Sequence, residues 1–249
     1  MKKKIFALAV TAATLAVVAV GGSMAYLQAA TLPKNNVFTA SANISLKLAE
    51  PKWDGYEFSD LHELGLIVPP EEPGIKPEYE GAVLGKELAS HYVPGDAIPK
   101  DPRIQNTSVH DVYVAMKVSY YGWDSAEEKD VEMSYSEFQE LYGTIEFLEK
   151  TEGEGWKQVK AGPNGENLNN EFFIYTSKLN AKTENQFSET TELFDKVVMV
   201  NRENAVDGMG SKFKVILTGY AVIAEGTEEI GEGGVPVYQN ELLKMAYVK

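Results

Sequence analysis

The sequence predicts an all-β protein with minor α content, arranged as a jelly-roll-like β-sandwich with short helices and a long inserted loop. Three observations support this fold class. Segments rich in β-branched and aromatic residues recur along the chain, as strands do. Gly, Asn and Pro turns separate these segments. The chain contains no cysteine, so a domain of this length has to be held together by its own hydrophobic core.

The first 25 residues have the three parts of a secretory signal peptide. A basic region of three lysines (residues 2–4) precedes an uncharged apolar run (residues 5–20), and small residues occupy positions 23 and 25. The apolar run is shorter than the roughly 20 residues that an α-helix needs to span a bilayer. We therefore expect cleavage between Ala25 and Tyr26, and an uncleaved anchor helix is the alternative.

Charge and composition exclude several classes of function. Loss of the three lysines would change the net charge from −14 to −17 and leave 224 of the 249 residues. Such an acidic chain has no basic surface for nucleic acid or for anionic lipid. Without cysteine there is no disulfide, no thiolate zinc site, no cysteine nucleophile and no lipoprotein anchor. The sequence predicts a secreted protein, and the lack of disulfides favours a Gram-positive cell exterior.

Strands are expected along most of the mature chain. Residues 43–48 alternate polar and apolar side chains, which is typical of a half-buried strand, and residues 112–121 form the most strongly predicted strand. Residues 145–149 and 156–160 flank a Glu-Gly-Glu-Gly turn and predict a β-hairpin. Further strands are expected at residues 171–176, 196–200 and 213–224.

Helices are the minority. Ser136 and Gln139 have the spacing of a capping box and predict a short helix that ends at Gly143. Asn240 is expected to cap a second helix over residues 241–246. The Pro-rich and acidic stretch of residues 53–93 predicts a long surface loop, inserted between the first two core strands.

The residues that could carry catalysis form no motif. The three histidines are His62, His91 and His110, and none has the i, i+4 partner that a zinc-binding helix requires. The chain has neither a Gly-x-Ser-x-Gly elbow nor a glycine-rich phosphate loop. We therefore expect no catalytic, cofactor-binding or metal-binding residue and no enzyme activity. A zinc site assembled from distant residues stays open as an alternative.

Two further alternatives concern ligand binding. The acidic stretches at residues 124–130 and 228–232 concentrate oxygen ligands, but neither has the EF-hand pattern, so solvated loops are expected and calcium is the alternative. A surface adhesion or binding module would need an exposed aromatic platform, built from residues such as Trp53, Tyr56 and Trp123. Buried aromatic side chains are commoner.

Several short motifs occur together in this chain. The most specific block combines Val-Pro-Gly-Asp at residues 93–96 with Lys-Asp-Pro-Arg-Ile-Gln-Asn-Thr-Ser at residues 100–108, just before the strand that begins at Val112. The others are the Gly-Gly-Ser-Met-Ala-Tyr end of the signal, the alternating segment 37–46, Leu-Phe-Asp-Lys-Val-Val at 193–198 and Gly-Tyr-Ala-Val-Ile-Ala-Glu-Gly at 219–226. In this combination, the chain resembles the TasA and camelysin (CalY) family of exported proteins, which a SipW-type signal peptidase processes.

The resemblance implies a jelly-roll domain over residues 43–249 that polymerises into extracellular fibres of a bacterial biofilm matrix or cell surface. It also implies that the N-terminal segment, residues 26–42, acts as a donor strand for the next subunit. The implied partners are other copies of the chain, the signal peptidase and an accessory matrix protein. Camelysin-like members have been called metalloproteases, which is the enzyme alternative. The insertion at residues 53–93 departs from the compact family pattern, so a fibre-capping or accessory subunit also stays open.

The composition of the N-terminal segment fits a donor strand. It carries one charge, Lys34, in an otherwise strongly acidic chain, so its pairing with a neighbour meets little repulsion. Pro33 removes one backbone donor and leaves the register of pairing open. The apolar or β-prone residues expected to enter the partner are Leu27, Leu32, Val37 and Phe38.

Overall fold

The computed structural model describes residues 26–29, 44–55, 57–58, 82–89, 92–93, 95–124, 126–184, 186–200, 209–231 and 234–248. The predicted signal peptide, residues 1–25, lies outside the described residues, as does the segment 30–43. The structure therefore does not describe seven residues that the sequence analysis names: Ala25, Leu32, Val37, Phe38, Tyr56, His62 and His91. Within the described ranges, no helix is long and apolar enough to cross a membrane.

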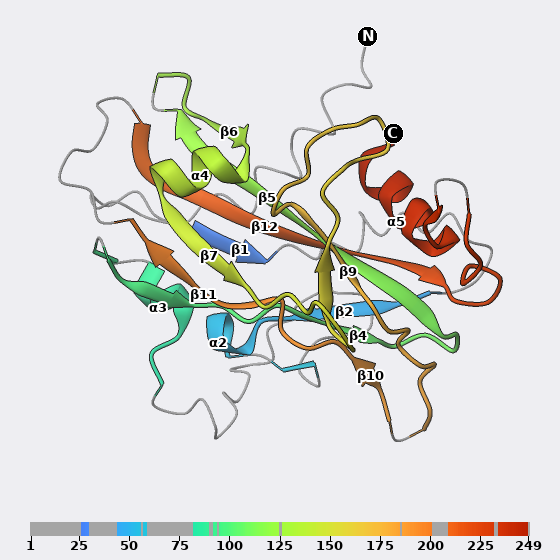
Figure 1. Cartoon of the computed structure of the whole chain (residues 1–249). Coiled ribbons are helices and arrows are strands. Elements are labelled where there is room, and N and C mark those ends of the chain that lie inside the picture. The colour runs from blue at the N-terminus through green and yellow to red at the C-terminus, as the bar shows by residue number, and fades with distance from the viewer. Residues whose placement is uncertain are drawn as a thin grey trace, which may run out of the picture.

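The fold is mostly β, and its largest sheet has six strands (Figure 1). The order in this sheet is β1-β12-β5-β9-β8, and β6 also pairs with β5. All of its pairs are antiparallel except β1 with β12, which is parallel. The bounds are β1 (Tyr26–Ala29), β5 (Val112–Asp124), β6 (Lys129–Met133), β8 (Trp156–Gln158), β9 (Phe172–Tyr175) and β12 (Met209–Ile223).

Two smaller antiparallel sheets complete the β structure. One has the order β10-β4-β2, and the other has the order β3-β11-β7. Their bounds are β2 (Leu46–Ala49), β3 (Ala97–Pro99), β4 (Arg103–Asn106), β7 (Gly143–Phe147), β10 (Ser188–Glu189) and β11 (Phe194–Met199). The all-β prediction is therefore confirmed at the level of fold class.

The central strand β5 shows why these residues form a sheet. Val112, Val114, Met116, Val118 and Tyr120 alternate along it, and all five side chains are buried. A strand points successive side chains to opposite faces, so this alternation buries one face in the main core. The other face of the large sheet carries a second, smaller core beneath helix α5 (Val237–Tyr247), which contacts β5 and β12 and which Figure 1 shows near the C-terminal end of β12.

The two predicted helices exist, but both begin at other residues than expected. Helix α4 (Tyr135–Leu141) is capped by Ser134, whose hydroxyl accepts from the backbone nitrogen of Glu137 while the Glu137 carboxylate accepts from the backbone nitrogen of Ser134. The expected box at Ser136 and Gln139 has the same spacing but lies two residues further on. Helix α5 follows Pro236, so Asn240 lies inside it rather than at its cap.

The predicted hairpin at residues 145–149 and 156–160 is wrong. Strand β7 pairs with β11 and strand β8 pairs with β9, so the two segments belong to different sheets. An isolated parallel bridge between Glu149 and Trp156 is what joins them. Trp156 is fully buried, and its indole nitrogen donates to the carbonyl oxygen of Thr191 at 2.8 Å. Burial of Trp156 in the core thus places β8 beside β9, although the local sequence is typical of a hairpin.

The ends of the insertion at residues 53–93 are part of the core rather than surface loop. Helix α2 (Pro51–Asp54) leads into it and helix α3 (Gly85–Ala89) lies near its end. Phe58 and Leu84 are buried. A Cβ atom on Gly85 would lie 2.0 Å from the carbonyl oxygen of Pro99, so α3 packs with its backbone directly against β3. The middle of the insertion lies outside the described residues.

Candidate functional site

The first candidate site is the outer edge of strand β12. Strand β1 is the terminal strand of the large sheet and pairs with β12 alone. The parallel register places Tyr26 opposite Lys214, Leu27 opposite Val215 and Ala29 opposite Leu217. Helix α3 lies close to β1. Over these four positions, the edge of β12 is thus covered by a strand from the N-terminal segment (Figure 1).

Buried side chains and an ion pair fix strand β12 in the sheet. Phe213, Val215 and Leu217 alternate along the strand and are almost completely buried. The intervening Lys214 forms an ion pair with Asp130 of strand β6. The other edge of β12 is paired with β5 from Phe213 to Ile223. The edge that meets β1 therefore belongs to a strand that is fixed on its other side, and its backbone groups can pair with one strand added there, the position that β1 occupies.

The structure places some of the predicted donor residues at this edge. Tyr26 and Leu27 lie in β1, at the edge of the sheet, while the other candidate donor residues lie outside the described residues. Sequence reasoning missed the acceptor: residues 213–224 were expected as a strand, with no indication that one edge of it receives the N-terminal segment. Edge position depends on sheet order, which no local pattern in β12 reports.

The second candidate site is an ion pair between Glu50 and Lys100. Glu50 directly follows β2 and precedes α2, and Lys100 directly follows β3. Lys100 Nζ lies 2.6 Å from Glu50 Oε1, and the two side chains are 0% and 1% exposed. The Lys100 ammonium also lies 4.9 Å from the centre of the Trp53 ring. Both charged groups are therefore enclosed by protein.

Asp101 and Arg103 extend this site toward the surface. Asp101 Oδ1 accepts a 2.7 Å hydrogen bond from the backbone nitrogen of Lys52, at the start of α2. Asp101 Oδ2 lies 3.9 Å from the Arg103 guanidinium, which also contacts Glu57 at 3.3 Å. The Lys-Asp-Pro-Arg motif thus bridges the end of β3 and the start of β4. Sequence reasoning singled out this motif but gave no sign that Glu50 is its partner.

Burial dominates the electrostatics of this cluster. Loss of water raises the pKa of Glu50 to about 7, although the charge of Lys100 acts in the opposite direction. The same burial lowers the pKa of Lys100 against the pull of Glu50. Burial also raises the pKa of Asp101 to about 6, against its hydrogen bond from Lys52. Burial therefore shifts the pKa of each of these three groups toward its neutral form.

Asp101→Asn is expected to flatten the dependence of stability on pH between about pH 4 and pH 6. The pKa of Asp101 is raised from 3.8 to about 6, so in this range the folded state binds more protons than the unfolded state. The contribution of Asp101 to the free energy of unfolding therefore falls as pH rises, by about 3 kcal/mol in total. Asparagine keeps an acceptor for Lys52 but does not titrate.

The measurement is urea unfolding of both proteins at a series of pH values. Asp195→Asn is the matched control because this carboxylate is 37% exposed, and it should keep the wild-type slope. An Asp101→Asn slope equal to that of the wild-type chain would contradict the assignment of Asp101.

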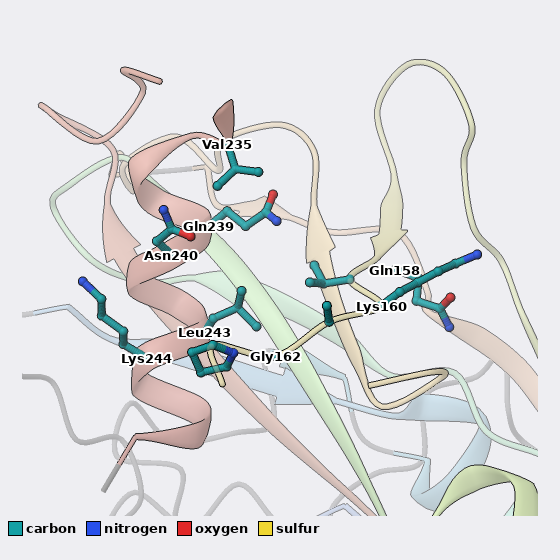
Figure 2. A pocket seen from close by; sticks show the side chains of 11 residues that line it. Gln158, Lys160, Gly162, Val235, Gln239, Asn240, Leu243 and Lys244 are labelled. Atoms are coloured by element: carbon teal, nitrogen blue, oxygen red, sulfur yellow. The ribbon is translucent and has the colours of Figure 1, made fainter. Parts of the chain in front are cut away.

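Figure 2 shows an open pocket between helix α5 and the segment that follows β8. Its volume is about 760 Å³. The amides of Gln158, Gln239 and Asn240 and the side chains of Lys160 and Lys244 line it, and no carboxylate is among its lining residues. The Lys244 ammonium is paired with Glu241 at 2.9 Å. The pocket can hold a polar ligand, but it contains no catalytic constellation.

The remaining predicted sites do not come together in the structure. Among the described residues, no group of three His, Asp or Glu side chains is placed to hold a metal ion. In the acidic turn at residues 124–130, Asp124 Oδ1 accepts from the backbone nitrogens of Ala126 and Glu127. Trp53 packs against the core beside Lys100, whereas Trp123 lies in β5 of the large sheet.

Known proteins add no further assignment, because no family model, curated protein or solved structure matches this chain.

Proposed function

We propose that this chain is a structural subunit of extracellular fibres, on a bacterial cell surface or in a biofilm matrix. In this proposal its strands form a jelly-roll sandwich, and a SipW-type signal peptidase releases the mature chain. Subunits assemble by donor-strand complementation, with residues 26–42 of one subunit completing the sheet of the next. The observation that supports this most directly is the parallel pairing of β1 with the outer edge of β12.

The geometry of this edge supports strand exchange between subunits. The backbone groups of residues 214–217 pair equally well with β1 of the same chain or with β1 of a neighbour. Each ladder hydrogen bond contributes a net stabilisation of about 0.5–1.5 kcal/mol, so a longer donor segment would hold subunits firmly. The donor and the acceptor are different surfaces. A head-to-tail contact of this kind produces open filaments when its rotation does not close a ring.

Signal cleavage would control the exchange. Strand β1 begins at Tyr26, the residue expected to become the new N-terminus. While the signal peptide is attached, this end is held at the membrane and cannot reach another subunit. Cleavage releases it, and a released terminus stays mobile unless a partner ties it down.

Electron microscopy of the purified protein tests the proposal. The chain that begins at Tyr26 is expected to form filaments, because its donor segment is free to pair with a neighbouring β12. The same chain with residues 1–25 retained, kept soluble in detergent, is the control and should remain unassembled. N-terminal sequencing of the filaments should give Tyr26 first. Monodisperse particles of the mature chain at all concentrations would contradict the proposed function.

A further inference from the structure

The Glu50–Lys100 pair lacks the support that buried ion pairs need. Apart from their contact with each other, the two carboxylate oxygens of Glu50 and the amine nitrogen of Lys100 have no hydrogen-bond partner within the described ranges. Taking two charges out of water costs several kcal/mol per ion, and their attraction compensates only when additional hydrogen bonds satisfy the remaining atoms. An unsupported pair at 2.6 Å is therefore an expensive arrangement for two separate charged groups.

We propose that Lys100 and Glu50 are joined by an intramolecular amide bond that forms spontaneously once the chain has folded. The structure then represents the two groups poised for reaction. The amine and the carboxyl are in contact, both are excluded from solvent, and the fold holds them together. Holding two reactants in contact in this way can supply effective molarities of about 10⁵–10⁸ M. The inference stands independently of the proposed fibre function.

The reaction needs no co-reactant. The ion pair first becomes neutral, as one proton moves from the Lys100 ammonium to the Glu50 carboxylate. The lone pair of Nζ then attacks Cδ of Glu50. The Nζ–Cδ bond forms, the bond from Cδ to the hydroxyl oxygen breaks, and the hydroxyl leaves with one amine proton as a water molecule. No atom is oxidised or reduced, and the product carries no charge.

The surroundings favour this step. Burial pushes the pKa of Glu50 up and the pKa of Lys100 down, and the neutral acid and neutral amine are the reactive forms. Asp101 is close enough for its charge to act on both groups. Trp53 covers the amine and keeps water, which would reverse the reaction, away from it.

The bond would have a structural consequence for the insertion. Glu50 follows β2 of one small sheet, and Lys100 follows β3 of the other. The link would therefore tie the two small sheets together and close a covalent loop around residues 51–99. That loop contains the whole insertion at residues 53–93, whose conformational freedom in the unfolded chain would fall, as it does in a loop closed by a disulfide.

Mass spectrometry of the denatured full chain tests the proposal directly. The intact mass is expected to be lower than the sequence mass by one water molecule. Trypsin should then fail to cut after Lys100, because its amine is acylated. The digest should contain residues 48–52 joined to residues 87–103, instead of separate peptides that end at Lys52, Lys100 and Arg103. The unchanged sequence mass would overturn the proposal.

Two substitutions provide matched controls. Lys52 lies 3.0 Å from Glu192, but these side chains are 38% and 33% exposed, so this pair should stay an ordinary ion pair. Lys52→Met should keep the loss of one water, and Lys100→Met should restore the full sequence mass. A loss of water confined to a linear peptide, such as succinimide formation at Asp54-Gly55 or Asp207-Gly208, would also overturn the cross-link. The mass of the wild-type chain tests the proposal even if a variant fails to fold.

Discussion

A mature chain that lacks residues 26–41 is expected to remain a folded, soluble monomer and to form no filaments. The deletion removes β1, which contributes four residues to the edge of the large sheet. The main core does not depend on this strand, because β12 stays paired with β5 and its inward side chains stay buried. The truncated subunit would keep an acceptor edge but would have no strand to donate.

This asymmetry allows a sharper test than the loss of assembly alone. In the proposed assembly, a truncated subunit would accept the donor strand of a growing filament but would not bind the next subunit. Mixed with the mature chain, it is expected to shorten the filaments in proportion to its fraction. Filament lengths measured by electron microscopy report this effect, and circular dichroism with urea unfolding checks that the truncated chain is folded. Filaments of normal length from the truncated chain alone would show that donor-strand assembly is wrong.

Phe138→Ala is expected to destabilise the fold by about 3–5 kcal/mol, the usual cost of removing a buried phenylalanine ring. The Phe138 side chain is completely buried. Its ring centre lies 5.0 Å from that of Tyr120, 5.3 Å from that of Phe213 and 6.0 Å from that of Tyr142. The substitution would leave a cavity where α4 packs against β5 and β12.

The free energy of unfolding in urea measures this effect. Phe187→Ala is the matched control, since it removes the same kind of side chain at a position where the phenylalanine is 50% exposed. It should change the free energy of unfolding by no more than about 0.5 kcal/mol. Phe213 lies directly before the residues of β12 that pair with β1, so Phe138→Ala should also weaken filament formation. A loss of stability below about 1 kcal/mol would mean that the neighbouring rings collapse into the cavity.

Local patterns in the sequence were sufficient for most of the elements. The β-branched and aromatic residues of 112–121 predict β5, the alternation of residues 43–48 predicts β2, and β9, β11 and β12 are predicted to within a few residues. These signals are local because a half-buried strand needs an apolar side chain at every second position. The helix α4 is also predicted by a local pattern, the spacing of a capping box. Its cap was misplaced because Ser134 and Ser136 both have an acceptor three residues further along.

Pairing between distant segments was decided by the tertiary structure alone. Residues 145–149 and 156–160 look like a hairpin, but the burial of Trp156 places β8 beside β9 and leaves β7 to pair with β11. Strand β1 covers the edge of β12 although nearly 200 residues separate them, and Glu50 meets Lys100 across the whole insertion. A sequence shows which side chains favour a strand or a core. Which edge stays open, and which two charges meet in the dry interior, depends on how all the strands pack at once.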